Sequence, residues 1–325
     1  MSLRRVAGRQ LVKVIAVRVL TALPVLGYVA FISFLTTNAF AGDATGPVRL
    51  RSSRSIKPGI LALSQPFFER FWQWIQPIIA HGYFGSSLLS GEPVGTVIAS
   101  RIPVTAELLA FSLVISFACA LPVAIAAARR PGGPADRVSR VISTAGLGIP
   151  ALVLALVLLL VFGSGEVTHL RAFVPLSQGV TANLASLLLP AVAIAFGAFC
   201  VYSRLLRAEI IDQTLGHDYV VTARAKGAGS WRVLLSHILG NSMLGSMRLS
   251  GRNLAGVIGA TVVVEQIFAI PGIGQGLLVA LNDRDFPVVN GFVLTFAVAV
   301  VIAGLLSDVA HAVLDPRTRR ADAIS

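Results

Sequence analysis

Charged residues are scarce in this chain: only 13% of its 325 residues are Asp, Glu, Lys or Arg, whereas 55% are hydrophobic. This balance, with a mean hydropathy of +0.80, excludes an ordinary soluble domain and predicts an integral membrane protein. Acidic residues are the scarcest charges, 15 against 27 Lys and Arg, so the formal net charge is +12. The basic residues cluster between apolar runs, where they orient the chain and meet anionic membrane lipid, so no nucleic-acid partner is expected.

Reactive and metal-binding motifs are missing as well. Cys119 and Cys200 lie inside apolar stretches, which excludes a disulfide framework and a Cys-x-x-Cys redox motif. The five histidines are scattered without a metal-binding spacing, so no metal site is expected. Neither a Gly-x-x-x-x-Gly-Lys-Ser/Thr phosphate loop nor a Gly-x-Ser-x-Gly nucleophile elbow occurs. We therefore expect no catalytic residue, no cofactor bound by this chain, and no enzyme activity.

Six apolar runs predict six transmembrane helices. They cover residues 19–40, 104–128, 141–162 and 186–203, a fifth run that ends near residue 268, and residues 288–307. The loop between the second and third runs carries four arginines and is placed inside, whereas the loops 163–185 and 269–287 each carry one basic residue and are placed outside. This alternation puts both termini in the cytoplasm. A cleaved signal peptide at the N-terminus, the competing interpretation, would contradict it.

The predicted organisation has four parts. Residues 1–40 form the cytoplasmic N-terminus and the first helix, 41–103 a long external loop, 104–310 the core of helices two to six, and 311–325 a cytoplasmic tail. Residues 66–74 of the external loop are typical of an amphipathic helix. Its aromatic rings have two predicted positions that stay open: against lipid headgroups or the helix bundle, or as a lid under a docked binding protein.

The cytoplasmic stretch 204–243 is more than a linker. It carries five basic residues: Arg204, Arg207, Arg224, Lys226 and Arg232. Asp218 can cap a helix over 219–226 that Gly227 stops, and Ser230 can cap a second helix from Trp231 onward. Two short helices hinged at 227–229, each about 12 Å long, would form a knob that fits a groove on a soluble partner.

The run Asp-Tyr-Val-Val-Thr-Ala-Arg-Ala-Lys-Gly at 218–227, followed by His-Ile-Leu-Gly-Asn at 237–241, resembles the coupling loop of the peptide/nickel permease family of ATP-binding-cassette importers. Gly240 stands where the family usually has Arg. Further matches lie at 262–274, 283–287 and 314–317, so the resemblance covers nearly the whole chain.

This resemblance implies an all-α fold of the type I importer permease, six spans, and a multi-pass position in the bacterial plasma (inner) membrane. It also implies a second homologous permease, two cytoplasmic ATP-binding subunits or domains that use ATP and Mg²⁺, and an extracytoplasmic substrate-binding (lipo)protein. The implied cargo is a di- or oligopeptide, with a nickel or other metal chelate, or haem, as alternatives. The residues implied to couple to the ATPase are Asp218, Tyr219, Thr222, Ala223, Arg224, Ala225, Lys226, Gly227 and His237.

Helix five holds the candidates for the substrate path: Arg252, Asn253 and Glu265. Arg252 lies thirteen residues before Glu265, about 20 Å along a helix, within a hydrocarbon layer of about 30 Å. Either its head reaches the cytoplasmic surface, or it faces the path with Asn253 and meets a substrate carboxylate. A self-sufficient secondary carrier is the alternative from another class of transporter.

Overall fold

The computed structural model describes residues 3–43, 66–162, 173–215 and 218–314, apart from the side chains of 3–14, 38–43, 224, 237, 244, 247–252 and 314. These parts are almost entirely helical, which confirms the predicted all-α class. The elements are α1 Leu3–Asp43, α2 Phe67–His81, α3 Val94–Arg129, α4 Pro134–Leu147, α5 Ala151–Phe162, the 3-10 turn η3 Leu176–Gln178, α6 Val180–Leu215, α7 Asp218–Ala225, α8 Ser230–Val233, the π-helical turn η4 Leu234–Ile238, α9 Leu239–Ile267, α10 Ile273–Asn282 and α11 Phe286–Leu314.

Four helices in the described residues are long and apolar enough to cross a membrane: α1, α3, α6 and α11. The helix predicted over 141–162 is not continuous. It is broken between α4 and α5, which meet at an angle of 101° and count as a fifth candidate span if taken together. The break falls at 148–150, where Pro150 has no backbone N–H to continue the helix and disfavours the α conformation of the residue before it.

The observed helices are longer than the apolar runs that predicted them. The second begins at Val94 rather than near residue 104, inside the segment expected to be external loop. The helix predicted to end near 203 continues to Leu215, and the last one continues from 307 to Leu314. Hydropathy locates only the lipid-facing part of a helix, whereas its backbone hydrogen bonds continue into water, so these boundaries were wrong at their polar ends.

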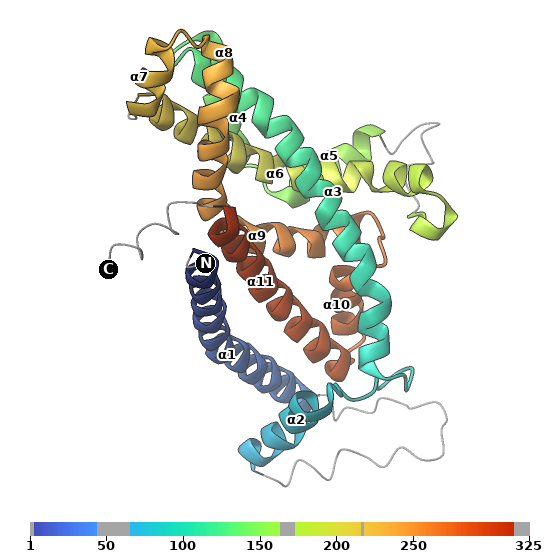
Figure 1. The fold of residues 1–325 in the computed structure, drawn as a ribbon. Coiled ribbons are helices and arrows are strands. Elements are labelled where there is room, and N and C mark those ends of the chain that lie inside the picture. Colours follow the sequence, from blue (N-terminus) through green and yellow to red (C-terminus); the bar gives the residue numbers. More distant parts are fainter. Residues whose placement is uncertain (1–2, 44–65, 163–172, 216–217, 315–325) are drawn as a thin grey trace.

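The main core forms where α3, α6 and α9 pack together. In it, Tyr202 of α6 stacks on Phe117 of α3 with 4.3 Å between ring centroids. A second core joins the first turns of α3 to α10 and α11, around Val94, Ile273 and Phe292. Figure 1 shows α7 and α8 at one end of the molecule and α2 at the opposite end. The long helix α3 reaches from the second core to the end that carries α8.

The first and last helices lie against each other. Arg18 of α1 forms an ion pair with Asp308 of α11. Farther along α1, the hydroxyl of Ser33 donates a hydrogen bond to Asn290 Oδ1 at 2.6 Å. The two helices are therefore joined by polar contacts as well as by apolar packing.

The amphipathic helix predicted over 66–74 is confirmed and is longer, as α2. Its aromatic side packs on α1, where the ring of Phe34 lies 5.3–5.6 Å from the rings of Phe67, Phe71 and Trp74. Phe68 and Trp72 point outward and are 73% and 63% exposed. The inward aromatic rings of α2 therefore contact the helix bundle. That the outward side of α2 meets lipid headgroups or a docked binding protein stays a prediction.

Candidate functional site

The stretch that was predicted to be cytoplasmic folds into a bent segment that we call the elbow, residues 218–238. The predicted helix over 219–226 is confirmed as α7, and its N-terminal acid Asp218 suits the positive end of a helix dipole. The second arm differs from the prediction: α8 is the start of a continuous run through η4 into α9. Gly229, not Ser230, precedes its first helical residue, and no side chain caps it, so the Ser230 cap was wrong. The elbow is therefore one short helix folded against the beginning of a long one.

Gly227 ends α7 by its backbone conformation. Its φ of +80° lies in the left-handed region that disfavours residues with a Cβ, and nothing lies within 4 Å of where a Cβ would stand. The next N–H, that of Ala228, donates back to the carbonyl of Ala223 at 3.1 Å, the closing bond of a Schellman motif. Glycine is thus required here by dihedral angle and not by space.

One side of the elbow is anchored in the core. Val220 and Val233 are each only 1% exposed and belong to the main apolar cluster. The hydroxyl of Tyr219 donates a hydrogen bond of 2.7 Å to Gln213 Oε1 near the end of α6. Because these contacts tie α7 and α8 to α6 and the core, a displacement of the elbow must move the helices attached to it.

The other side of the elbow faces outward. Val221 is 68% exposed, Trp231 51% and Leu235 55%, and Lys226 of the same segment is exposed as well. Thr222 and Ala225 are exposed too. The side chains of Arg224 and His237, which were predicted to act here, lie outside the described residues. Large apolar side chains on a surface with a basic residue are typical of a protein–protein contact.

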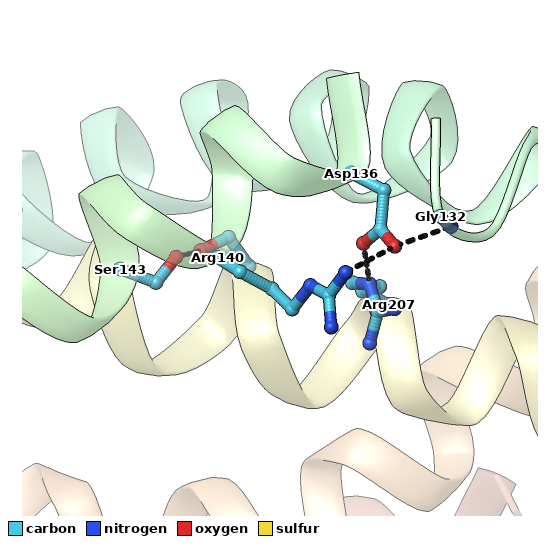
Figure 2. Close-up of polar contacts among 6 residues, drawn as sticks. Gly132, Asp136, Arg140, Ser143 and Arg207 are labelled. Atoms are coloured by element: carbon cyan, nitrogen blue, oxygen red, sulfur yellow. Dashed lines mark hydrogen bonds and ion pairs between the residues drawn. The ribbon is translucent and has the colours of Figure 1, made fainter. Parts of the chain in front are cut away.

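A buried carboxylate braces the structure next to the elbow, and the sequence analysis missed it. Figure 2 shows Asp136, near the start of α4, between Gly132, Arg140 and Arg207. Its carboxylate is 1% exposed, accepts the Gly132 N–H at 2.8 Å, and forms ion pairs with Arg207 of α6 and, at 3.3 Å, with Arg140. The available signal was one acid within a short loop of arginines. Arg207, interpreted from sequence as a topology residue, is the partner of that acid.

The same two helices approach closely farther along. The hydroxyls of Ser143 in α4 and Ser203 in α6 lie 3.0 Å apart within hydrogen-bond distance. At Gly146, a Cβ would stand 2.4 Å from the sulfur of Cys200, closer than atoms can approach. The small and polar side of α4 therefore packs directly on α6.

The end of α3 also contacts the elbow. The guanidinium of Arg129, the last residue of α3, lies 4.4 Å from the ring centroid of Trp231 in α8, the geometry of a cation–π contact. The elbow is thus in contact with α3 as well as with α6 and α9.

The substrate-path candidates on α9 do not converge. Glu265 is fully buried, and its carboxylate accepts hydrogen bonds from the Thr105 hydroxyl and from the N–H groups of Gly274 and Gln275 at 2.7–3.1 Å. Glu265 therefore fixes the start of α10 by accepting two of its backbone N–H groups. Asn253 lies about 18 Å away along the helix and lines a groove between α5, α6 and α9. The side chain of Arg252 lies outside the described residues.

Comparisons with known proteins identify the family. Residues 120–320 match the family of binding-protein-dependent transport system inner membrane components. The dipeptide transport system permease protein DppB of Lactococcus lactis subsp. cremoris is 31% identical over 79% of this chain and 82% of its own length. The oligopeptide transport system permease protein AppB of Bacillus subtilis is 30% identical over 92% of this chain and 97% of its own. The glutathione transport system permease protein GsiC of Salmonella choleraesuis is 30% identical over 93% and 97%.

These matches confirm the resemblance to importer permeases and the inner-membrane location. A component of such a system is a transport subunit rather than an enzyme, and it works with a binding protein and an ATPase. The chain belongs to the family of binding-protein-dependent transport system inner membrane components.

Proposed function

We propose that the chain is one of two homologous membrane subunits of an ATP-binding-cassette importer that takes up peptides. The relatives support this cargo, since they are named for dipeptides, oligopeptides and glutathione, which is itself a tripeptide. Two ATP-binding subunits or domains hydrolyse ATP with the help of Mg²⁺ in the cytoplasm, and a substrate-binding (lipo)protein delivers the peptide outside.

The proposed subunit crosses the membrane six times with both termini inside. The four long helices supply four spans and the bent pair α4–α5 a fifth. The apolar part of α9, residues 253–267, is about 22 Å long and too short to cross alone. The whole of α9, Leu239–Ile267, has 29 residues and is about 43 Å long, enough to make the sixth span. The elbow then lies at the start of this span, on the side that we assign to the arginines of the α3–α4 turn.

The observation that carries the proposal is the two-sided elbow. Its inner side is fixed in the core by Val220 and Val233, and its outer side presents Val221, Lys226 and Trp231. A surface of this kind can receive a push from an ATPase and pass it to α6 and α9 without bending. We therefore assign Arg252 with Asn253 to the peptide path, and the following residues to coupling: Asp218, Tyr219, Thr222, Ala223, Arg224, Ala225, Lys226, Gly227 and His237.

Reconstitution tests the function. The importer is placed in proteoliposomes with and without its ATPase subunits, and uptake of a labelled peptide is measured with binding protein present. We expect uptake only with ATPase and ATP. Uptake by this chain without an ATPase would identify a secondary carrier instead.

The coupling role of the elbow is tested at Gly227. Gly227→Val forces a β-branched residue into a left-handed conformation, which costs about 1–2 kcal/mol or more, and we expect peptide uptake to fall while the ATPase subunits still fold and bind ATP. Gly229→Ala is the matched control, because Gly229 has an ordinary extended backbone with φ −65° and ψ 150° and open space for a methyl group. Wild-type uptake by the Gly227→Val importer would show that the elbow does not transmit the movement of the ATPase to the membrane helices.

A further inference from the structure

Helix α3 contacts the elbow at its last residue and the start of α10 in its first half. It has 36 residues, about 54 Å at 1.5 Å per residue, and runs without interruption through Pro103 and Pro122. Figure 1 shows it extending from the region of α10 to the end of the molecule that carries α8. A helix of this length resists stretching, so a displacement at one end reaches the other.

The end of α3 next to the elbow has two neighbours, the elbow itself and, through the turn that follows α3, helix α6. Arg129 lies 4.4 Å from the Trp231 ring of the elbow, and neither residue is buried, so this contact is open to change. Immediately after it, the turn that leads to α4 is tied to α6 through Asp136 and Arg207 (Figure 2). The end of α3 therefore moves with the elbow on one side and with α6 on the other.

In its first half, toward the outer end, α3 is hydrogen-bonded to the start of α10. The hydroxyl of Thr105 donates to Glu265 Oε1 at 2.7 Å and accepts the N–H of Ile273 at 2.8 Å. One turn earlier, Arg101 Nη1 donates to the carbonyl of Gly272 at 3.1 Å. These hydrogen bonds have fixed directions and are largely buried. We therefore expect the first turn of α10 to move together with α3.

We propose that α3 transmits the movement of the elbow to α10, with the Arg129–Trp231 contact as its inner joint and the Thr105–Glu265 hydrogen bond as its outer joint. Arg129 and Thr105 are then positioning residues: they touch neither peptide nor nucleotide, and they set how far the outer end responds to the ATPase. This inference rests on the proposed coupling function of the elbow and adds a second route, beside α6 and α9, by which the stroke crosses the membrane.

The test uses the complete importer and a reporter on α10. Val279, which is 43% exposed, is replaced by Cys in a Cys119→Ser background, where the remaining Cys200 is buried. The labelling rate of the new cysteine by a membrane-impermeant maleimide is measured with and without ATP and vanadate. Peptide uptake per ATP hydrolysed is measured on the same preparation.

Each joint has a disrupting variant and a rescuing one. Arg129→Gln removes the cation and Arg129→Lys restores it, while Arg130→Gln removes a neighbouring exposed charge as the matched control. At the outer joint, Thr105→Val removes the hydroxyl and Thr105→Ser keeps it. We expect Arg129→Gln to lower uptake per ATP about two- to five-fold, the range that corresponds to an exposed cation–π contact of about 0.5–1 kcal/mol.

Both disrupting variants should also shrink the ATP-dependent change in labelling, and both conservative variants should recover it. A wild-type labelling response in Arg129→Gln or in Thr105→Val overturns the inference. An equal loss in Arg130→Gln also overturns it, because the effect would then be one of net charge. If the labelling rate in the parent protein does not change with ATP while ATP-driven uptake is intact, the inference fails and the proposed function stands. If the parent shows no ATP-driven uptake, the proposed function itself fails.

Discussion

Replacing Asp136 by Asn should destabilise the subunit by about 3 kcal/mol. The carboxylate is 1% exposed and its partner Arg207 has a side chain that is 18% exposed, so the pair is largely withdrawn from water. Asn keeps the shape and can still accept the Gly132 N–H, but it leaves the charge of Arg207 without its counter-ion. Breaking a buried pair in this way costs about 3–5 kcal/mol, and the partial exposure of Arg207 places this case at the lower end.

The second ion pair of the same carboxylate is the matched control. Arg140 reaches Asp136 at 3.3 Å, but its side chain is 53% exposed, so solvent screens the contact. Arg140→Gln should therefore cost less than about 1 kcal/mol. The double variant Asp136→Leu with Arg207→Met removes both charges and should recover most of the loss, because apolar side chains of similar size replace a buried pair with little penalty.

Unfolding of the purified full-length subunit by sodium dodecyl sulfate in mixed micelles measures all four proteins on one scale. The reasoning is refuted if Asp136→Asn costs no more than Arg140→Gln, since the tie between α4 and α6 would then lie elsewhere. It is also refuted if the double variant is as unstable as the single one, because the cost would then come from lost packing and not from an unpaired charge.

Three other substitutions have defined outcomes. Gly146→Ala should lower the free energy of unfolding by about 1–3 kcal/mol in the same assay, because its methyl group meets the Cys200 sulfur at 2.4 Å; unchanged stability would contradict the close packing of α4 on α6. Glu265→Gln should destabilise by about 1–3 kcal/mol, because an amide cannot serve both the Thr105 hydroxyl and the α10 N–H groups as an acceptor; normal stability with altered peptide KM would instead place this residue in the path. Arg252→Gln should weaken uptake of carboxylate-bearing peptides relative to amidated ones, and equal uptake of both would exclude the site.

The first arm of the elbow was predictable because its signals are local. Residues 219–226 contain neither Gly nor Pro, so a short helix is permitted between Asp218 and Gly227, and its left-handed C-terminus needs only the glycine itself. The second arm was less predictable. Ser230 has the side chain of a good cap, yet Gly229 takes the position before the helix, and the arm continues into α9 because Val233 and Leu234 are buried in the core.

The surroundings of Glu265, a candidate for the substrate path, were not predictable from the sequence. Glu265 looked from the sequence like a rare acid in a membrane helix, where such residues often serve transport. In the structure it is enclosed by Thr105 and the start of α10, and its oxygens are occupied by hydrogen bonds. No pattern along the chain indicates that residue 105 lies beside residue 265.

The amino-acid sequence by itself determined the membrane class, the all-helical fold, and the short helix that Gly227 terminates. These properties depend on the transfer of side chains into lipid and on hydrogen bonds between near neighbours, so they can be predicted from consecutive residues. Only the tertiary structure decided the bend between α4 and α5, the burial of Asp136 beside Arg207, and the contacts of α3 with Trp231 and Glu265. The side-chain contacts join residues 71 to 160 positions apart in the chain, from Asp136 and Arg207 to Thr105 and Glu265, and only the packing of whole helices can bring such partners together.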